Sequence, residues 1–174
     1  MHTQDSARRV ASDSAVAGHV PPVWTPSAVP RAWKYLVLHH TATESDSMAS
    51  IDQAHRRRKD PQGKSWLGIG YHFVIGNGHG MEDGHVEPTF RWRKQLRGAH
   101  AGVGRYNDEG IGICLVGNFE DDRPTDKQFA AAKQLVGALR KQYGIHRENI
   151  VGHNQVKPTH CPGKNLLLKE IVGR

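Results

Sequence analysis

Residues 35–41 read Tyr-Leu-Val-Leu-His-His-Thr, an apolar run that ends at a pair of histidines. A short apolar run of this kind is typical of a buried strand. His39 and His40 therefore stand at the end of the expected strand, where neighbouring side chains point to opposite faces of a sheet. The first residues able to carry chemistry are thus placed at a strand end.

Further strands are expected later along the chain. Three more apolar runs predict them, at residues 71–75, 111–116 and 150–151. The Gly-Asn-Gly turn at 76–78 demands unusual backbone angles, so it predicts a hairpin that returns at residues 81–82.

Helices are expected between the strands. Asp46 or Ser47 can cap a helix that runs to about Lys59. A Thr-x-x-Gln capping box at 125–128 opens a long amphipathic helix that Gly144 ends. The alternation of strands and helices predicts an α/β fold with a central mixed β-sheet flanked by helices.

The two ends of the chain differ in composition. Residues 166–172 suggest a closing helix, whereas residues 1–30 hold four prolines and few large apolar side chains. We expect 1–30 to be a flexible tail and 31–174 to be a single domain, since the length fits roughly one domain of about 150 residues. Polar residues interrupt the stretch 10–20, so no secretory signal is expected there.

The net charge of +7 favours an anionic partner such as nucleic acid, a membrane surface or an acidic wall polymer. No apolar run approaches the ~18 residues of a membrane helix, so no membrane span is expected. The basic run at 56–59 suits the last turn of a helix. No base-stacking aromatic motif accompanies it, and we therefore expect no nucleic-acid partner.

A histidine and a cysteine, His153 and Cys161, share one loop after the last expected strand. Both are zinc ligand types, and three protein ligands with an open fourth position let zinc activate water and polarise a carbonyl. A third ligand can come from His39 or His40, also at a strand end. The sequence thus favours a catalytic zinc site.

Six motifs stand in the order found in type 2 zinc-dependent N-acetylmuramoyl-L-alanine amidases, a family that includes phage lysozyme-type amidases and peptidoglycan recognition proteins. They are Leu36–Ala42, Trp66–Ile75, Gly98–Ala101, Ile111–Gly117, Gly152–His153 and Pro158–Pro162. The chain resembles this family over about residues 31–174. The resemblance implies a Zn2+-floored groove and cleavage of the amide between the lactyl group of N-acetylmuramic acid and L-alanine of peptidoglycan.

Carried over residue by residue, the resemblance makes His39, His153 and Cys161 the zinc ligands. Tyr71 matches the tyrosine that helps to activate the zinc-bound water or stabilises the oxyanion; the alternative is a half-buried strand tyrosine. Thr159 is the second expected catalytic donor. The expected substrate contacts are His40, Trp66, His100 and Asn118. The alternatives are packing for His40, a core position for Trp66 and a plain turn position for Asn118.

The sequence departs from the family pattern at two positions. Phage members often carry lysine where this chain has Thr159, and a hydroxyl supplies no positive charge. A cytoplasmic recycling branch places a glutamate base where this chain has Cys114, which is most simply a small buried residue. The resemblance is therefore closer to the lytic, endolysin-like branch.

Two functions follow from the resemblance. One is a bacteriolytic amidase, a monomer that acts on peptidoglycan or muropeptides in the periplasm, outside the cell, or after release from a phage host. The alternative is a non-catalytic peptidoglycan-binding module of the same fold. Members that lack the cysteine ligand behave in this second way, so the presence of Cys161 favours the enzyme.

Overall fold

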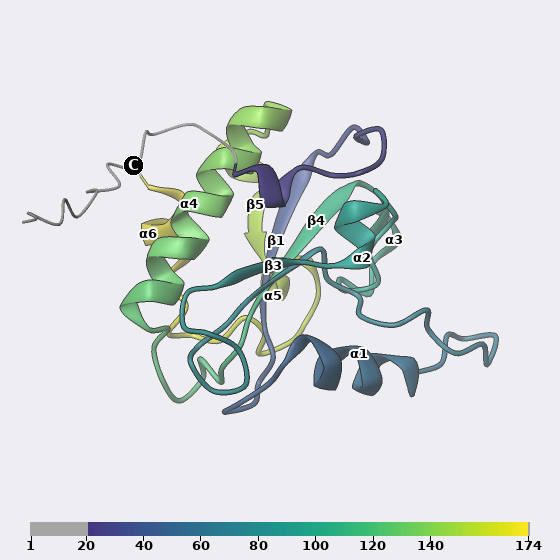
Figure 1. Ribbon diagram of the computed structural model, residues 1–174, viewed down its shortest axis with the longest axis horizontal. Coiled ribbons are helices and arrows are strands. Elements are labelled where there is room, and N and C mark those ends of the chain that lie inside the picture. The colour runs from purple at the N-terminus through teal and green to yellow at the C-terminus, as the bar shows by residue number, and fades with distance from the viewer. Residues whose placement is uncertain (1–20, 174) are drawn as a thin grey trace, which may run out of the picture.

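A five-stranded sheet with the order β3-β2-β4-β1-β5 lies at the centre of the computed structural model, which describes residues 21–173 (Figure 1). The strands are β1 (Tyr35–His40), β2 (Phe73–Ile75), β3 (Val86–Pro88), β4 (Gly110–Leu115) and β5 (Ile150–Gly152). All neighbours pair in parallel except β2 and β3, which pair antiparallel. The expected mixed sheet is confirmed.

Helices cover both sides of the sheet. They are η1 (Pro22–Trp24), α1 (Met48–Arg56), α2 (Phe90–Arg93), α3 (Gly104–Glu109), α4 (Asp126–Tyr143), η2 (Arg147–Asn149), α5 (His153–Val156) and α6 (Leu168–Val172). Figure 1 shows α4 and α6 on one side, with α1, α2 and α3 on the other. Among residues 21–173, no helix has the length and apolar character needed to cross a membrane.

Side chains point alternately to the two faces of the sheet, and each face packs into its own hydrophobic core. Leu36 and Leu38 of β1 belong to the larger core, which includes Leu135 and Leu139 of α4. A smaller core on the other face joins Val74 of β2 to Ile51, Ile69 and Val116, with Tyr71 packed against it. This second face also carries the candidate site.

The capping signals at 125–128 and Gly144 delimit α4 as expected. The Thr125 hydroxyl accepts the Gln128 N–H at 3.0 Å, and the Gln128 side chain accepts the Thr125 N–H at 3.2 Å. Gly144 ends the helix with φ at +62°, a left-handed conformation that glycine adopts at low cost.

Ser47 caps α1, but this helix ends at Arg56 rather than at about Lys59. The chain leaves the helix because residues 59–65 form a small turn of their own. Lys59 and Ser65 make an antiparallel bridge, and the Asp60 carboxylate accepts the Lys64 N–H at 2.8 Å.

The hairpin after β2 is present, but its return strand lies at Val86–Pro88 instead of 81–82. The connection is longer because it contains its own turns: the Gly78 N–H donates to Met81 O at 2.8 Å, and the Gly84 N–H donates to Gly76 O at 2.9 Å. β2 itself begins at Phe73, two residues later than expected.

The segment before residue 31 differs from the expected tail in the part that the structure describes. Trp24 is buried in the larger core, and its carbonyl accepts the indole N–H of Trp92 at 2.6 Å. The Ser27 hydroxyl donates to Arg93 O at 2.8 Å. Burial of Trp24 therefore holds this segment against the domain in spite of its proline-rich composition. Residues 1–20 of the expected tail lie outside the described residues.

Candidate metal centre and its surroundings

His39 and His40 point to opposite faces of β1. His39 lies across from Cys114 in the register of β1 and β4 and is only 1% exposed. The His40 ring lies on the other face, where its Nδ1 accepts the Phe119 N–H at 3.1 Å. Only the ring of the first histidine therefore faces the candidate site, and the contact with Phe119 agrees with packing, one of the two alternatives for His40.

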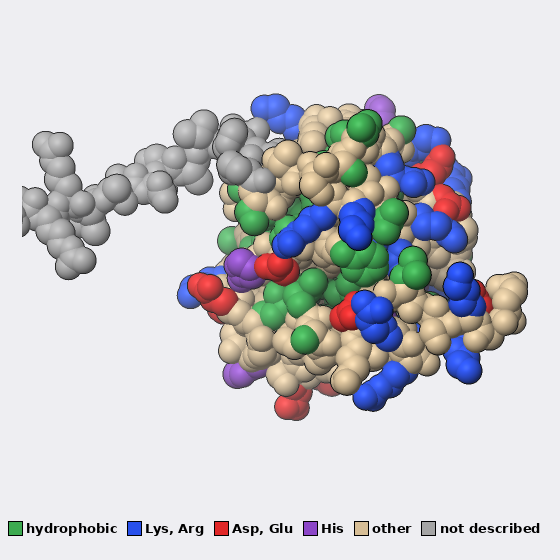
Figure 2. Space-filling model, turned by 45° about the vertical axis from the view of Figure 1, so that its right-hand side comes forward, with side chains coloured by type: hydrophobic (Ala, Val, Ile, Leu, Met, Phe, Trp, Pro, Cys, Tyr) green, Lys and Arg blue, Asp and Glu red, His purple; other side chains and the backbone are tan. Residues whose placement is uncertain are grey.

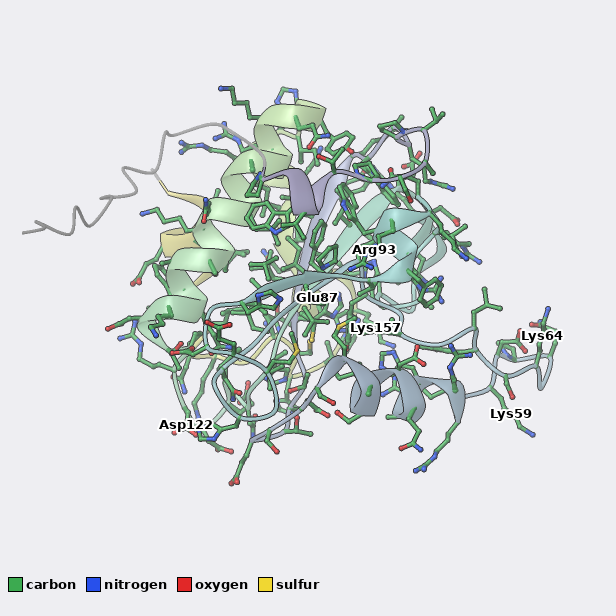
Figure 3. All side chains as sticks on the ribbon, in the orientation of Figure 1. Lys59, Lys64, Glu87, Arg93, Asp122 and Lys157 are labelled. Carbon is green, nitrogen blue, oxygen red and sulfur yellow. The ribbon has the colours of Figure 1, made fainter. Side chains whose placement is uncertain are left out.

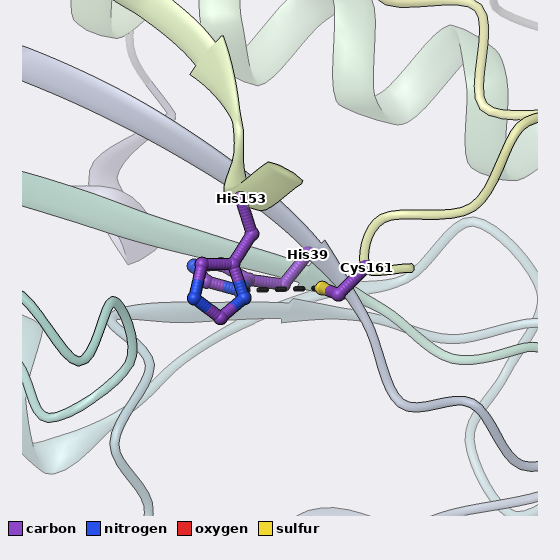
Figure 4. A group of neighbouring side chains, drawn as sticks. All are labelled: His39, His153 and Cys161. Carbon is purple, nitrogen blue, oxygen red and sulfur yellow. Dashed lines mark hydrogen bonds between the residues drawn. The ribbon is translucent and has the colours of Figure 1, made fainter. Parts of the chain in front are cut away.

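His39, His153 and Cys161 form one cluster, in which the potential ligand atoms all lie within 4.8 Å of one another. Figure 4 shows them converging from β1, from the start of α5 and from the loop that follows. The Cys161 Sγ lies 3.5 Å from His39 Nδ1. Zn–S and Zn–N bonds of ~2.3 and ~2.0 Å at a tetrahedral angle separate sulfur and nitrogen by about this distance, so the donor set fits zinc.

Hydrogen bonds leave one ring nitrogen of each histidine free for a metal. His153 Nε2 lies 3.0 Å from Ala101 O, and His39 Nε2 lies 3.0 Å from His100 Nδ1. A carbonyl oxygen can only accept, so His153 carries its proton on Nε2. The Nδ1 atom of His153 is thereby available as a ligand, and that of His39 is available when His39 Nε2 is the donor to His100.

Burial sets the protonation of the three side chains. Burial lowers the pKa of His39 far below its usual value, and that of His153 to a lesser degree. Burial also raises the pKa of the Cys161 thiol to about 11. At neutral pH the metal-free cluster therefore holds two neutral imidazoles and a thiol, which must lose its proton when it binds a metal ion.

Tyr71 stands beside the cluster. Its ring centroid lies 5.1 Å from that of His39 and 5.3 Å from that of His55. Burial, with the neighbouring thiols of Cys114 and Cys161, raises the pKa of the Tyr71 hydroxyl well above its usual value. The hydroxyl is thus held in its protonated form, which donates hydrogen bonds.

Thr159 is the other expected donor. Its Oγ1 accepts the Cys161 N–H at 3.3 Å, so the hydroxyl lies next to the backbone of the candidate ligand. Cys114 is fully buried, as expected for a small apolar residue on the strand beside β1. No carboxylate therefore occupies that position of the sheet.

A cavity of about 230 Å³ opens next to Tyr71 and is lined also by Thr41, Asp46, His55 and Arg58. Trp66 is partly exposed and contacts two of the lining residues, with its ring 5.5 Å from that of His55 and the Arg58 guanidinium 5.4 Å from its centroid. The expected placement of Trp66 beside a groove is thus compatible with the structure. The cavity lies between α1 and the segment 41–46 that follows β1, the strand that carries the candidate ligand His39.

The remaining two expected contacts lie elsewhere. His100 is 8% exposed and lies behind His39, where Gly98 and Gly112 leave room for its ring, so its imidazole meets a candidate ligand rather than a groove. Asn118 belongs to a turn, in which its side chain donates to Asp121 at 2.6 Å. It lines a separate hollow of about 320 Å³ with Asn77 and His79, and its turn alternative describes it better.

Sequence reasoning missed His55 and Asn107. His55 is buried at the end of α1, where its Nδ1 accepts the Gly70 N–H at 2.9 Å. The Asn107 side chain accepts the backbone N–H groups of His100 and Ala101. The apolar spacing of the first helix offered a signal for His55, but Asn107 acts through a contact between a loop and a helix that no local pattern reveals.

Comparison with known proteins agrees with this geometry. Residues 29–164 match the family model described as N-acetylmuramoyl-L-alanine amidase. Peptidoglycan-recognition protein SC2 of Drosophila melanogaster is 33% identical over 138 residues, which cover 76% of this chain and 69% of that protein.

Solved structures lead to the same family. The endolysin N-acetylmuramoyl-L-alanine amidase LysCS from Clostridium intestinale URNW has a TM-score of 0.68 and 27% identity, over 88% of this chain and 95% of that one. A variant of Drosophila PGRP-LB, solved in complex with tracheal cytotoxin, has a TM-score of 0.61 and 28% identity over 79% of each chain. Both enzymes and recognition proteins thus carry this fold.

Proposed function

This chain belongs to the N-acetylmuramoyl-L-alanine amidase family, and from that premise we propose that it is a zinc-dependent amidase of bacterial peptidoglycan. It hydrolyses the amide between the lactyl group of N-acetylmuramic acid and the L-alanine of the stem peptide. The observation that carries the proposal is the convergence of His39, His153 and Cys161 beside a cavity lined by Tyr71.

The three proposed ligands suit a zinc ion that takes part in hydrolysis. When bound, zinc supplies a Lewis acid that polarises the scissile carbonyl and activates a water molecule. His39 and His153 act as neutral imidazole ligands, and Cys161 acts as a thiolate. Three protein ligands, rather than four, are the donor set typical of catalytic zinc sites, so these residues would hold the ion in a form suited to hydrolysis.

Two hydroxyls serve the transition state. Tyr71 keeps its proton because burial raises the pKa of its hydroxyl, and it donates a hydrogen bond to the oxygen on which negative charge develops. Thr159, next to Cys161, is the second donor. A donor already in place when charge develops stabilises the transition state more than the ground state, so it speeds the reaction.

The cavity beside Tyr71 receives the substrate. Arg58 supplies a positive charge for the carboxylates of a stem peptide, and Trp66 supplies an aromatic surface for a sugar or an apolar side chain. We assign the partner as peptidoglycan or its soluble muropeptides, bound by a monomer.

Mass spectrometry of muropeptide digests tests the activity. The purified protein is expected to release free stem peptide, to lose this activity on chelation and to regain it with zinc. His153→Ala and Cys161→Ala remove ligands, and each is expected to reduce turnover at least ~100-fold. His146→Ala is the matched control, because the side chain of His146 is 75% exposed and lies outside the site.

Two results would contradict the proposal. A chelated protein that still cleaves would exclude zinc chemistry. A zinc-loaded protein that binds muropeptides without cleaving them would favour the non-catalytic recognition module, the other activity that this fold supports.

A further inference from the structure

Both imidazoles of the proposed centre are held by the same short loop, Gly98–Ala101. His39 Nε2 lies 3.0 Å from Nδ1 of His100, and His153 Nε2 lies 3.0 Å from the carbonyl oxygen of Ala101. Two consecutive residues of the loop therefore contact two ligands that are more than one hundred positions apart in the sequence. The mechanism proposed above uses neither residue of the loop.

Fixed acceptors determine where the protons lie. His100 Nε2 lies 3.3 Å from Gly110 O, and because a carbonyl only accepts, His100 carries its proton on Nε2. Its Nδ1 is then an acceptor and receives the Nε2–H of His39. The chain of bonds from Gly110 through His100 to His39 thus leaves His39 Nδ1 without a proton, directed at Cys161 Sγ.

Asn107 fastens this loop. Its Oδ1 accepts the N–H of His100 and the N–H of Ala101, both at 2.9 Å, and its backbone carbonyl accepts the N–H of Gly98 at 2.8 Å. Asn107 lies in α3, which leads directly into β4. Asn107 therefore accepts three of the four backbone N–H groups of the loop, including both that belong to the residues in contact with the ligands, while the Ala99 N–H donates to Gly70 O at 3.0 Å.

Two glycines make room for the His100 imidazole. A Cβ atom at Gly112 would lie 2.6 Å from Cγ and Cδ2 of the ring, and one at Gly98 would overlap the same ring. Real side chains do not approach so closely, so the slot admits the imidazole only because both positions lack a Cβ. The slot fixes the plane of the ring, and with it the direction of the bond to His39.

We propose that Asn107 is a positioning residue for the metal centre, which acts through His100 and Ala101 to orient both imidazole ligands. The inference rests on the proposed function to the extent that zinc is the bound ion. A hydrogen bond to the second nitrogen of a ligating imidazole fixes its orientation and makes it a stronger ligand. Loss of Asn107 would loosen both bonds at once.

The test compares two substitutions in the full chain. Asn107→Leu is similar in size but has no acceptor, whereas Asn107→Asp keeps an acceptor oxygen. Competition with a chelating dye measures the zinc dissociation constant, and the visible spectrum of the Co2+-substituted protein reports the ligand geometry. We expect Asn107→Leu to weaken zinc binding ~10–100-fold and to change the spectrum, and Asn107→Asp to retain most of the affinity.

Gln95→Leu is the matched control. Gln95 is also a buried amide that joins separate segments, through hydrogen bonds with the Trp33 indole and Trp92 O, both at 2.8 Å. We expect this substitution to lower the free energy of unfolding while the zinc dissociation constant stays the same. An equal loss of zinc affinity in the Gln95 and Asn107 variants would overturn the inference, because the effect would then be general destabilisation.

If Asn107→Leu does not fold, a second pair of variants tests whether His100 supports zinc binding through its acceptor nitrogen. His100→Asn keeps an acceptor near the Nδ1 position, whereas His100→Leu removes it, so only His100→Leu is expected to weaken zinc binding strongly. Equal zinc affinities in these two variants would overturn the inference, and so would a wild-type zinc affinity in folded Asn107→Leu. Neither result would contradict the proposed amidase function. A wild-type protein that binds zinc without cleaving muropeptides would overturn the activity alone.

Discussion

At the scale of single residues, His39 and His40 show how backbone direction separates two chemically identical side chains. β1 sends the His39 ring towards Cys161 and the His40 ring towards Phe119. This separation follows from strand alternation and could be predicted from the sequence. The hydrogen-bond partners of each ring could not, because they come from segments far away in the chain.

Tyr71 offers a direct test of transition-state stabilisation. Tyr71→Phe removes the hydroxyl but leaves the ring that packs near His39. We expect turnover to fall ~10–1000-fold while zinc content stays the same, since the hydroxyl acts on developing charge. Metal analysis of the purified variant, run beside muropeptide kinetics, separates the two effects. A Tyr71→Phe protein without zinc would mean that the tyrosine supports the metal instead.

The buried histidines make stability dependent on pH. Burial lowers the pKa of several of them, to about 3 for His72 and about 4 for His55, whereas an unfolded chain has values near ~6.5. Below this value the unfolded state binds more protons, so the free energy of unfolding falls as the pH drops towards 4. The loss is about 1.4 kcal/mol per pH unit for each such histidine.

Urea unfolding of the metal-free protein between about pH 7 and pH 5 measures this loss. His72→Asn removes one titrating ring but keeps an acceptor for the Gly112 N–H, which His72 Nδ1 accepts at 2.9 Å. The variant is expected to show a shallower dependence on pH than the wild type. Identical slopes in the two proteins would refute the assignment of His72 as a neutral buried ring.

At the scale of elements, substitution by alanine is expected to change stability in opposite directions at two glycines, one in a strand and one in a helix. In β4, Gly112→Ala drives a methyl group into His100, so we expect a loss of about 2 kcal/mol or more of stability together with weaker zinc binding. In α4, a Cβ at Gly137 meets nothing within 4 Å. Gly137→Ala is therefore expected to gain ~0.5–1 kcal/mol. Thermal unfolding and zinc titration of the two variants check both signs.

Elements with local signals could be predicted, and those defined by tertiary contacts could not. α4 is marked by a capping box, an apolar face and a terminal glycine, all within its own sequence. α3 has no buried residue, and α2 is one turn held by the burial of Trp92 and Arg91, so neither carries an apolar period. β3 is three residues long, and its register depends on a loop that precedes it.

The residues of the candidate site also fall into two groups, those that the sequence predicts and those that it does not. His39, His153 and Cys161 stand in motifs that resemble a known family, and the structure brings these three together. His100 also stands in such a motif, yet its contact with His39 could not be read from the sequence. Asn107 had no signal at all, because its role depends on the approach of α3 to a loop.

At the scale of the whole molecule, the positive charge leads to a prediction about the proposed partner, the bacterial cell wall. The chain carries a net charge of +7, and Figure 2 shows Lys and Arg side chains spread over much of one face. Lys59 and Lys64 project from the loop beyond α1 (Figure 3), and α1 is the helix that contributes Ile51, Ala54 and His55 to the lining of the cavity. Such a surface favours anionic wall polymers.

Binding to isolated cell walls is therefore expected to weaken as salt rises. Dissolved ions screen the attraction between exposed charges that lie more than ~8 Å apart at physiological ionic strength, and this distance shortens as salt is added. Sedimentation of the protein with walls at increasing salt measures this. The substitution of Lys59 and Lys64 by Gln should reduce the salt dependence without altering cleavage of small soluble muropeptides. Wall binding that is indifferent to salt would rule out an electrostatic contribution.

The spacing of the ligands along the chain has a consequence for biosynthesis. Cys161 stands 122 positions after His39, and His153 comes only shortly before it. A ribosome releases β1 early, but it delivers the sulfur only after all five strands have been translated. Every product of premature termination before that point lacks at least one of the three proposed metal ligands. Under the proposed function, a cell that makes this protein would therefore gain hydrolytic capacity only from messages translated past Cys161.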